Sequence, residues 1–384
     1  MVSNVSCFSK DRYCNRIKTI NAIHALPKVL QILVIIIILF TRYILHLSAL
    51  PFPGYFIKML IDSFNRIHNY LRISLTDNCN LRCFYCMPEE DYAFAPAAQL
   101  MQTNEIEKIA QTFVRLGVDK IRLTGGEPLV RKDAARIIGS LGKLPTSLHI
   151  TTNGVRLHEF ISVLEEANIK SINVSLDTLQ PDKFQLITRR NNFARVWDNI
   201  HLLVEKGIHV KVNVVAMKGL NDNEINDFIG WTKNTPVHVR FIEFMPFAGN
   251  KWTSNKVFTW QQILTTVESA YSFFPIKADA NDTAKKYIVP GHAGTFAVIS
   301  TMTAPFCSTC NRMRLTADGK LKNCLFSKGE TDLLTALRKG EDIEALIRKS
   351  IGSKAKELGG QFINDFENVQ SHEIQNRSMI AIGG

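Results

Sequence analysis

Short β-branched runs alternate with longer amphipathic stretches between residues 71 and 244. The runs that predict strands are Leu71–Thr76, Lys120–Thr124, Leu148–Thr152, Ile172–Leu176, His209–Val215 and Val237–Phe244. The intervening stretches that predict helices include Asn104–Leu116, His158–Ala167, Val196–Glu205 and Asn223–Lys233. Strands alternating with helices indicate βαβ units and a parallel sheet, which right-handed crossovers curl into a barrel. We therefore predict an α/β fold, a partial (β/α)6 TIM-like barrel over residues 61–250.

The pattern changes after residue 250. Ala317-Asp318-Gly319 separates Arg312–Thr316 from Lys320–Leu325, and this arrangement predicts a β-hairpin. Helices are expected at Thr331–Lys339 and Glu341–Leu358. Residues 251–384 are thus predicted to form a C-terminal α+β extension, and its cysteines, discussed below, give it a cluster-binding role.

The first sixty residues differ from the rest of the chain. An apolar run from Val29 to Phe40 would rise about 18 Å as a helix, which is short of a bilayer core. Three alternatives stay open: a segment outside the native protein with translation starting at Met59, a weak membrane or targeting segment, or an ordered appendage. We expect the 59–384 form to be soluble and active.

Charge is unevenly distributed along the 384 residues. The formal net charge is +11, and residues 1–60 hold four Lys, three Arg and one Asp. The positive charge that remains in residues 61–384 is modest and suits an anionic small molecule. That part of the chain contains no basic run with interleaved aromatic residues, so nucleic-acid binding is not expected. The composition is that of an ordinary globular protein, and a cytoplasmic location is expected.

Six of the eight cysteines form two triplets. Cys79, Cys83 and Cys86 have the spacing C-x3-C-x2-C and directly follow the first predicted strand. Three thiolates can hold a [4Fe–4S] cluster by three of its irons, which leaves one iron open to a small chelating molecule. A structural zinc site would need a fourth ligand, and the nearest histidine, His68, precedes the strand.

The second triplet is Cys307, Cys310 and Cys324. It predicts a second cluster with an open iron, although Asp318, Asn323 or His292 can complete a zinc site instead. Arg312 and Arg314 follow Cys310 at a spacing of two, so both guanidiniums share one face of a strand. Forked guanidiniums beside a cluster suit a phosphate ligand.

The first triplet, followed one βα unit later by Gly125-Gly126-Glu127-Pro128, resembles the radical S-adenosylmethionine (SAM) superfamily. The resemblance implies that the open iron binds the methionine amino and carboxylate groups of SAM, and that reductive cleavage gives a 5′-deoxyadenosyl radical. It assigns cofactor contacts to Tyr85, Gly125, Gly126, Glu127, Ser175 and Met245. The two glycines would permit close approach of the methionine amine.

From about Asp62 to the terminal Gly383-Gly384, the chain resembles the GTP 3′,8-cyclase family of molybdenum cofactor biosynthesis. Shared segments include Asp62-x-Phe64-x-Arg66, Asn173-Val-Ser-Leu-Asp177 and Phe306-Cys-Ser-Thr-Cys310. The resemblance implies two [4Fe–4S] clusters, a C-terminal tail inserted in the active site, and GTP as substrate. Its GTP contacts would be Arg72, Arg122, Thr151, Lys211, Arg240, Arg312 and Arg314.

The implied reaction removes hydrogen from C3′ of GTP, joins C3′ to C8, and ends at 3′,8-cyclo-7,8-dihydro-GTP after uptake of one electron and one proton. The implied partners are an electron donor of flavodoxin or ferredoxin type, the next enzyme of the pathway, cyclic pyranopterin monophosphate synthase, and a second copy of the chain as a homodimer. Two alternatives remain: a peptide-modifying radical enzyme with auxiliary clusters, and a non-catalytic zinc-binding module.

Overall fold

The computed structural model describes residues 59–89, 91–277, 279–361, 366–369 and 374–383, together with Pro27 and Leu30. Residues 1–57 and 58–384 separate into two compact units, and the account below concerns the second. The predictions about the first sixty residues therefore lie almost wholly outside the described residues. In the part of the chain that is described, no helix is both long enough and apolar enough to cross a membrane.

One mixed sheet runs through the second unit, and its described strands follow the order β12-β11-β10-β1-β2-β3-β4-β5-β6-β9-β8-β7. The first six strands are parallel neighbours in chain order, which confirms the predicted part-barrel. Their bounds are β1 Tyr70–Ser74, β2 Lys120–Thr124, β3 Ser147–Thr152, β4 Ser171–Ser175, β5 His209–Ala216 and β6 His238–Glu243.

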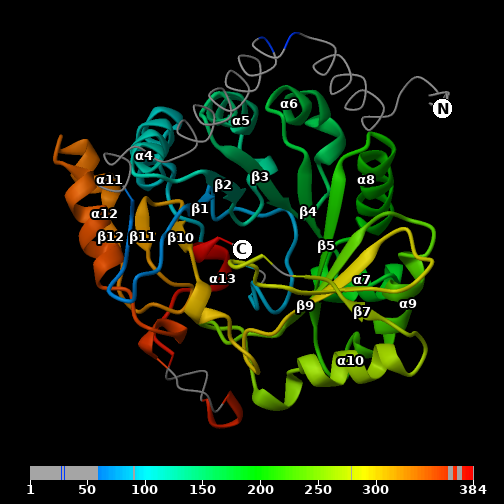
Figure 1. The fold of residues 1–384 in the computed structure, drawn as a ribbon. Helices are drawn as coiled ribbons and strands as arrows, with labels where there is room; N and C mark the ends of the chain where they lie inside the picture. Colours follow the sequence, from blue (N-terminus) through cyan, green and yellow to red (C-terminus); the bar gives the residue numbers. More distant parts are fainter. Residues whose placement is uncertain are drawn as a thin grey trace. The chain divides into compact units, whose positions relative to one another are not determined.

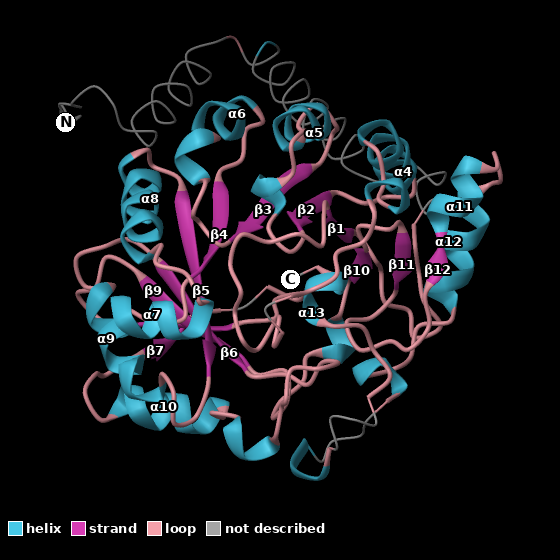
Figure 2. Ribbon diagram, turned by 180° about the vertical axis from the view of Figure 1, so that it is seen from behind, coloured by secondary structure: helices cyan, strands magenta, loops and turns pink. Residues whose placement is uncertain are grey.

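Helices cover the outside of this arc of strands, as Figures 1 and 2 show from opposite sides. The predicted helices are present, with ends shifted by a few residues, and α5, α7 and α10 were not predicted. The bounds are α4 Thr103–Arg115, α5 Ala134–Leu141, α6 Ile161–Glu166, α7 Pro181–Thr188, α8 Phe193–Glu205, α9 Ile225–Trp231 and α10 Trp260–Glu268.

The C-terminal region extends the same sheet at both edges. Strand β10 pairs in parallel with β1, and β9 pairs in parallel with β6, so eight parallel strands line the arc. The division at residue 250 stays a prediction, and the sheet crosses it. The elements are β7 Phe274–Pro275, β8 Lys285–Ile288, β9 Thr295–Ile299, β10 Arg312–Leu315, β11 Lys320–Lys322, β12 Thr331–Asp332, α11 Leu333–Arg338, α12 Ile343–Gly352 and α13 Met379–Ile382.

The predicted hairpin is confirmed, because β10 and β11 pair antiparallel with Arg314 opposite Lys322. The predicted helix over Glu341–Leu358 is wrong in length. It ends at Gly352, and the following turn carries Lys354 into the interior, where its side chain is only 3% exposed. The segment from Ser353 to Leu358 thus belongs to the site rather than to the helix.

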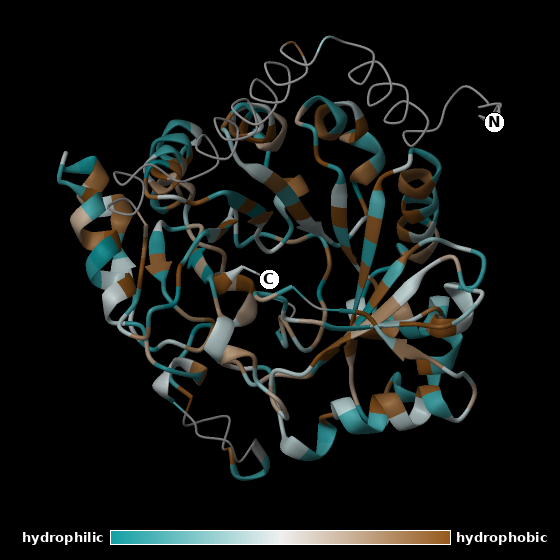
Figure 3. Ribbon diagram, viewed as in Figure 1, coloured by the Kyte–Doolittle hydropathy of each residue, from teal (hydrophilic) through white to brown (hydrophobic). Residues whose placement is uncertain are grey.

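Each central strand has an apolar face toward the helices and a polar face toward the centre of the arc. Leu71, Ile73, Ile121 and Leu123 are fully buried with the helix residue Phe113 in one core. Burial of each such side chain contributes about 1.5–3 kcal/mol to folding. The alternate strand positions carry charged and polar side chains instead, as the teal bands on the strands of Figure 3 indicate. This alternation makes the lumen of the part-barrel polar.

Candidate active site

The first cysteine triplet lies in the loop that leaves β1. Backbone N–H groups of Cys86 and Met87 donate to the Cys83 carbonyl at 2.9 and 2.8 Å, which closes a tight turn. The Phe84 N–H donates to the Ile187 carbonyl at the end of α7. The loop therefore has a fixed position at the carboxyl ends of the strands, as predicted from its place after the first strand.

The three thiols of this loop are close enough to influence one another. Burial raises the pKa of Cys83 well above its usual value, and Asp177, Cys86 and Cys79 raise it further. Burial and Cys79 likewise raise the pKa of Cys86 to about 12. Three half-buried thiolates that repel one another need positive charge to stay ionised, and the irons of a cluster would supply it. The residues present thus fit the predicted cluster.

The two predicted glycines after β2 pack against the cysteine loop. A Cβ on Gly125 would lie 2.7 Å from the Thr76 carbonyl oxygen, and one on Gly126 would lie 2.4 Å from that of Asn78. The Gly126 N–H also donates to the Thr76 carbonyl at 2.7 Å. Close contact between the two loops therefore requires glycine at both positions, whereas their predicted contact with the methionine amine stays a prediction.

Glu127 joins β2 to β3. Its carboxylate accepts hydrogen bonds from the Leu129 N–H, the Thr152 hydroxyl and the Asn153 N–H at 2.6–3.0 Å. Burial raises the pKa of Glu127 to about 7 despite these bonds. The structure thus gives this side chain a role in loop geometry, and its predicted contact with the cofactor remains a prediction.

Tyr85 and Ser175 line a small cavity of about 40 Å³ beside Cys83. The Tyr85 hydroxyl donates to Asp177 at 2.6 Å, and Asp177 also accepts from the Val215 N–H at 2.8 Å. Burial raises the pKa of Asp177 to about 6. Asp177 was not predicted as a site residue, and its buried carboxylate fixes the position of the Tyr85 hydroxyl.

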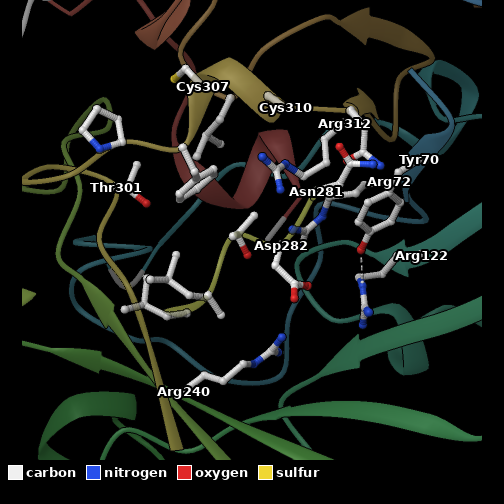
Figure 4. Close-up of a pocket in the computed structure, with 18 of the residues that line it drawn as sticks. Tyr70, Arg72, Arg122, Arg240, Asn281, Asp282, Thr301, Cys307, Cys310 and Arg312 are labelled. Carbon is white, nitrogen blue, oxygen red and sulfur yellow. Dashed lines mark hydrogen bonds between the residues drawn. The ribbon is translucent and has the colours of Figure 1, made fainter. Parts of the chain in front are cut away.

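A much larger cavity of about 470 Å³ occupies the polar lumen. Figure 4 shows Arg72, Arg122, Arg240 and Arg312 around it. The structure brings ten of the predicted site residues to its wall: Arg72, Arg122, Lys211, Arg240, Met245, Cys307, Cys310, Arg312, Arg314 and Cys324. Thr151 does not line it directly, and its hydroxyl instead accepts from Arg122 at 3.4 Å.

The cations of this cavity are held close together in a dry environment. Burial, followed by the nearby charge of Arg122, lowers the pKa of Arg240 to about 9. Burial lowers the pKa of Lys211 to about 8, with Arg240 and Arg122 as the next causes. The Arg240 Nε is buried and has no hydrogen-bond partner. A polyanion in the cavity would relieve both the repulsion and the unmet hydrogen bond.

Several residues of the cavity were not predicted, including Tyr70, Lys120, Asn173, Asn213 and Asn311. The Tyr70 hydroxyl accepts from Arg122 Nε at 2.5 Å, and the Asn213 amide oxygen accepts from Arg240 at 2.6 Å. Four of these residues lie two positions from a predicted contact on the same strand, or pair with a predicted contact on the neighbouring strand. They are Tyr70, Lys120, Asn173 and Asn213. The period-two rule identifies these positions.

An acidic segment also reaches the cavity. Asn281 and Asp282, which precede β8, point into it in Figure 4. Asp282 forms an ion pair with Lys286 at 2.6 Å. Nothing in the residue pattern placed this segment there, because it follows the two-residue strand β7, which was not predicted.

The second triplet forms around the β10–β11 hairpin. Cys310 lies two residues before β10, Cys324 lies two residues after β11, and the Cys310 N–H donates to the Cys307 carbonyl at 3.2 Å. Burial raises the pKa of Cys310, but Arg312 and Lys354 lower it to about 6. A thiolate at Cys310 is thus available as a ligand near neutral pH, so this triplet also fits a cluster.

Each residue that was a candidate for the fourth ligand of a zinc site binds another group in the structure. Asp318 forms an ion pair with Arg377 at 2.9 Å, and Asn323 donates to the Ser350 carbonyl at 2.7 Å. The His292 ring pairs with the Thr232 hydroxyl at 2.9 Å. Within the described residues, no group of three or more His, Cys, Asp or Glu side chains is arranged to hold a single metal ion.

The C-terminal tail enters the lumen, and its helix α13 lies near the centre of the arc in Figure 1. Ile380 and Ile382 of α13 are almost fully buried. Arg314 Nη1 donates to the Gly383 carbonyl at 2.7 Å. A Cβ on Gly383 would lie 2.8 Å from the Ser74 Cβ and 2.9 Å from the Thr124 hydroxyl. The tail thus contacts the ends of β1 and β2 and one of the predicted substrate contacts.

Two family models match the chain. The Radical SAM superfamily model matches residues 73–232, and the Molybdenum Cofactor Synthesis C model matches residues 237–359. Two solved structures share the fold. SuiB of Streptococcus suis bound to S-adenosylmethionine has a TM-score of 0.54 and 15% identity, covering 83% of this chain and 78% of that one. The structure of anSMEcpe with bound AdoMet has a TM-score of 0.54 and 14% identity, covering 82% and 85%.

Relatives with much higher identity fix the family. The mitochondrial GTP 3′,8-cyclase of Arabidopsis thaliana is 46% identical over 85% of this chain and 84% of its own length. The GTP 3′,8-cyclase of Peptoclostridium acidaminophilum is 40% identical over 85% of this chain and 99% of its own length. Human Molybdenum cofactor biosynthesis protein 1 is 43% identical, and the chain spans about half, 53%, of its length. The chain therefore belongs to the GTP 3′,8-cyclase family of the radical SAM superfamily.

Proposed function

We propose that this chain is a GTP 3′,8-cyclase that converts GTP to 3′,8-cyclo-7,8-dihydro-GTP in molybdenum cofactor biosynthesis. The observation that carries the proposal is the lumen cavity, whose wall combines five buried or half-buried cations with a cysteine triplet. Arg72, Arg122, Lys211, Arg240 and Arg314 suit a triphosphate. The triplet Cys307, Cys310 and Cys324 suits a metal-bound base.

Two [4Fe–4S] clusters belong to this proposal, one on each cysteine triplet. The first, with SAM bound to its open iron, supplies a carbon radical that can take hydrogen from an unactivated C–H bond. Tyr85, Ser175, Gly125, Gly126, Glu127 and Met245 are proposed to hold SAM. The aromatic ring of Tyr85 is fixed by its hydrogen bond to Asp177, so it can present a constant face to the adenine.

The chain contributes position and charge to the reaction. Buried guanidiniums already aimed at the lumen bind phosphate oxygens without reorganising, and forked pairs fix orientation as well as charge. The tail residue Met379 adds apolar surface to the wall of the lumen, which limits water around a reactive carbon. Holding C3′ of GTP beside C5′ of the cofactor makes hydrogen transfer effectively unimolecular, which contributes about 7 kcal/mol or more.

Anaerobic incubation of the reconstituted chain with SAM, dithionite and GTP tests the proposal. The expected product has the mass of GTP and loses the guanine C8–H resonance, while 5′-deoxyadenosine accumulates. Iron and sulfide should each approach eight atoms per chain. Four atoms of each, or 5′-deoxyadenosine with unchanged GTP, would contradict the proposal.

The remaining partners are part of the same proposal and follow from the family alone. They are an electron donor of flavodoxin or ferredoxin type, cyclic pyranopterin monophosphate synthase as the next enzyme, and a homodimer. A cytoplasmic location stays a prediction. The two earlier alternatives, a peptide-modifying enzyme and a zinc-binding module, have no comparable support, because the relatives of 40% identity and above carry other names.

A further inference from the structure

The motif Asp62-x-Phe64-x-Arg66 lies outside the lumen and has no part in the chemistry proposed above. Its residues precede β1, where Ile61 and Ile67 form an isolated antiparallel bridge. The Asp62 carboxylate accepts from Arg66 Nε at 2.6 Å and pairs with His68 Nε2 at 2.9 Å. All three side chains are buried, with exposed fractions of 4%, 8% and 1%. A buried polar cluster is stable only when its groups are paired, so we expect this cluster to fix a specific contact.

Arg66 connects this cluster to the second cysteine triplet. Its Nη1 donates to the Cys307 carbonyl at 2.8 Å and to the Lys356 carbonyl at 2.6 Å, and its Nη2 donates to the Ala355 carbonyl at 2.8 Å. One guanidinium thus joins the backbone of a predicted cluster ligand to the turn after α12. That turn also contains Lys354.

Lys354 uses all three of its donors in the same place. Its Nζ lies 3.3 Å from the Cys310 Sγ, 3.0 Å from the Arg312 carbonyl and 3.5 Å from His68 Nδ1. A lysine ammonium has three N–H donors and no acceptor, so His68 Nδ1 must accept. His68 therefore carries its proton on Nε2 and donates it to Asp62. Donation therefore runs outward from Lys354, to Cys310 on one side and through His68 to Asp62 on the other.

The charge balance at Lys354 identifies its principal partner. A buried ammonium is unfavourable unless an anion lies beside it. Of the three groups that accept from Lys354, the Arg312 carbonyl and the neutral His68 ring carry no net charge. The Cys310 sulfur is the one acceptor that can be an anion, as a thiolate or as a cluster ligand.

We propose that Lys354 is a positioning residue of the second cysteine triplet, which orients Cys310 and raises the reduction potential of the cluster bound there. This inference rests on the proposed function, which places a [4Fe–4S] cluster at Cys307, Cys310 and Cys324. Hydrogen bonds to cluster sulfurs and nearby positive charge favour the reduced, more negative state. The Asp62–His68 pair holds the ammonium in place.

Potentiometric titration of the reconstituted full chain, followed by EPR, tests this role. The reduction step of the first cluster is identified as the one that is absent from the titration of Cys83→Ala. Lys354→Met, which keeps the length of the side chain and removes charge and donors, should lower the midpoint potential of the second cluster. The first midpoint and uncoupled SAM cleavage should not change. Lys356→Met is the matched control, because Lys356 is exposed two residues away, and it should change neither midpoint.

Lys354→Gln keeps a donor without the charge and should give a midpoint between those of wild type and Lys354→Met. If Lys354→Met loses about half of its iron, Cys310 has lost its orientation as proposed. The midpoint potential of the second cluster is then measured on Lys354→Gln. An unchanged second midpoint in a variant with eight irons would overturn the role of Lys354 alone. A wild-type chain with four irons would overturn the second cluster and this inference together.

Discussion

Buried charge is the property of single residues that gives this site its specificity. Arg72, Arg240 and Arg314 lie in the lumen, where burial and neighbouring cations lower the pKa of each guanidinium. Such an arrangement is unfavourable by itself and becomes favourable when a polyanion enters. Three of the proposed substrate contacts can therefore be tested through the charge of the ligand.

Arg312→Ala and Arg314→Ala should each weaken GTP binding by about 1.5–3 kcal/mol, since each removes one set of charged hydrogen bonds. Guanosine has no phosphates, so its binding should change much less. Equilibrium binding of both ligands to each variant makes the comparison. Equal losses for GTP and guanosine would show that these arginines support the fold instead.

The pH dependence of GTP binding should report on Lys211, whose pKa of about 8 in the free protein is low for a lysine. A bound triphosphate favours the charged lysine and raises its pKa. The contribution of charged Lys211 to GTP affinity is therefore complete well below pH 8 and is lost as the pH rises above 8. Between pH 7 and pH 9 the affinity should fall by up to about tenfold from this group. Calorimetry on Lys211→Met should show a smaller fall, and an identical pH profile would contradict the assignment.

The cysteines of the two triplets should differ in their effects. Cys83→Ala removes a ligand of the first cluster and should abolish SAM cleavage. Cys310→Ala should leave that cluster intact, so uncoupled SAM cleavage persists while GTP turnover stops and iron content falls by about half. Chemical iron assay and 5′-deoxyadenosine formation distinguish the two. Normal SAM cleavage by Cys83→Ala, or full iron in Cys310→Ala, would contradict the respective cluster.

At the scale of elements, strands and their following loops were predictable and the connections between them were not. The runs around Leu71, Ile121 and Val212 alternate with period two, because one face packs on helices and the other lines the lumen. Strands β9 and β10 gave local signals too weak to place them in the parallel arc. Their pairing with β6 and β1 depends on contacts distant in sequence. The Asp282 segment and the inward turn at Lys354 were missed for the same reason.

The C-terminal tail provides a test at this scale. Gly383 has a φ of 88°, and a Cβ there would contact Ser74 and Thr124. An alanine at Gly383 would carry about 1–2 kcal/mol of backbone strain if the tail stayed in place, so Gly383→Ala should displace the tail and lower GTP turnover; the displacement relieves the strain, so the melting temperature should change little. Gly291→Ala is the matched control. Its φ of 80° is also positive, but no atom lies within 4 Å of the added Cβ. Equal turnover by both variants would contradict a role for the tail.

At the scale of the whole molecule, the part-barrel places two cysteine triplets at one lumen from opposite ends of the chain. The first follows β1, and the second surrounds the hairpin whose strand β10 pairs with β1. This pairing sets Arg72 beside Arg314, so the proposed substrate contacts of the two regions form one surface. The six cysteines and the arginine pair were predictable because their spacing is local. The shared surface was not, since it depends on the register between β1 and β10.

The central claim is that this lumen holds GTP with its C3′ hydrogen facing the radical generated at the first triplet. Anaerobic turnover of GTP deuterated at C3′, followed by mass spectrometry of 5′-deoxyadenosine, tests that claim most directly. The account predicts one deuterium in 5′-deoxyadenosine for each GTP cyclised, with the label absent from the product ribose. Unlabelled 5′-deoxyadenosine formed alongside cyclised product would contradict it.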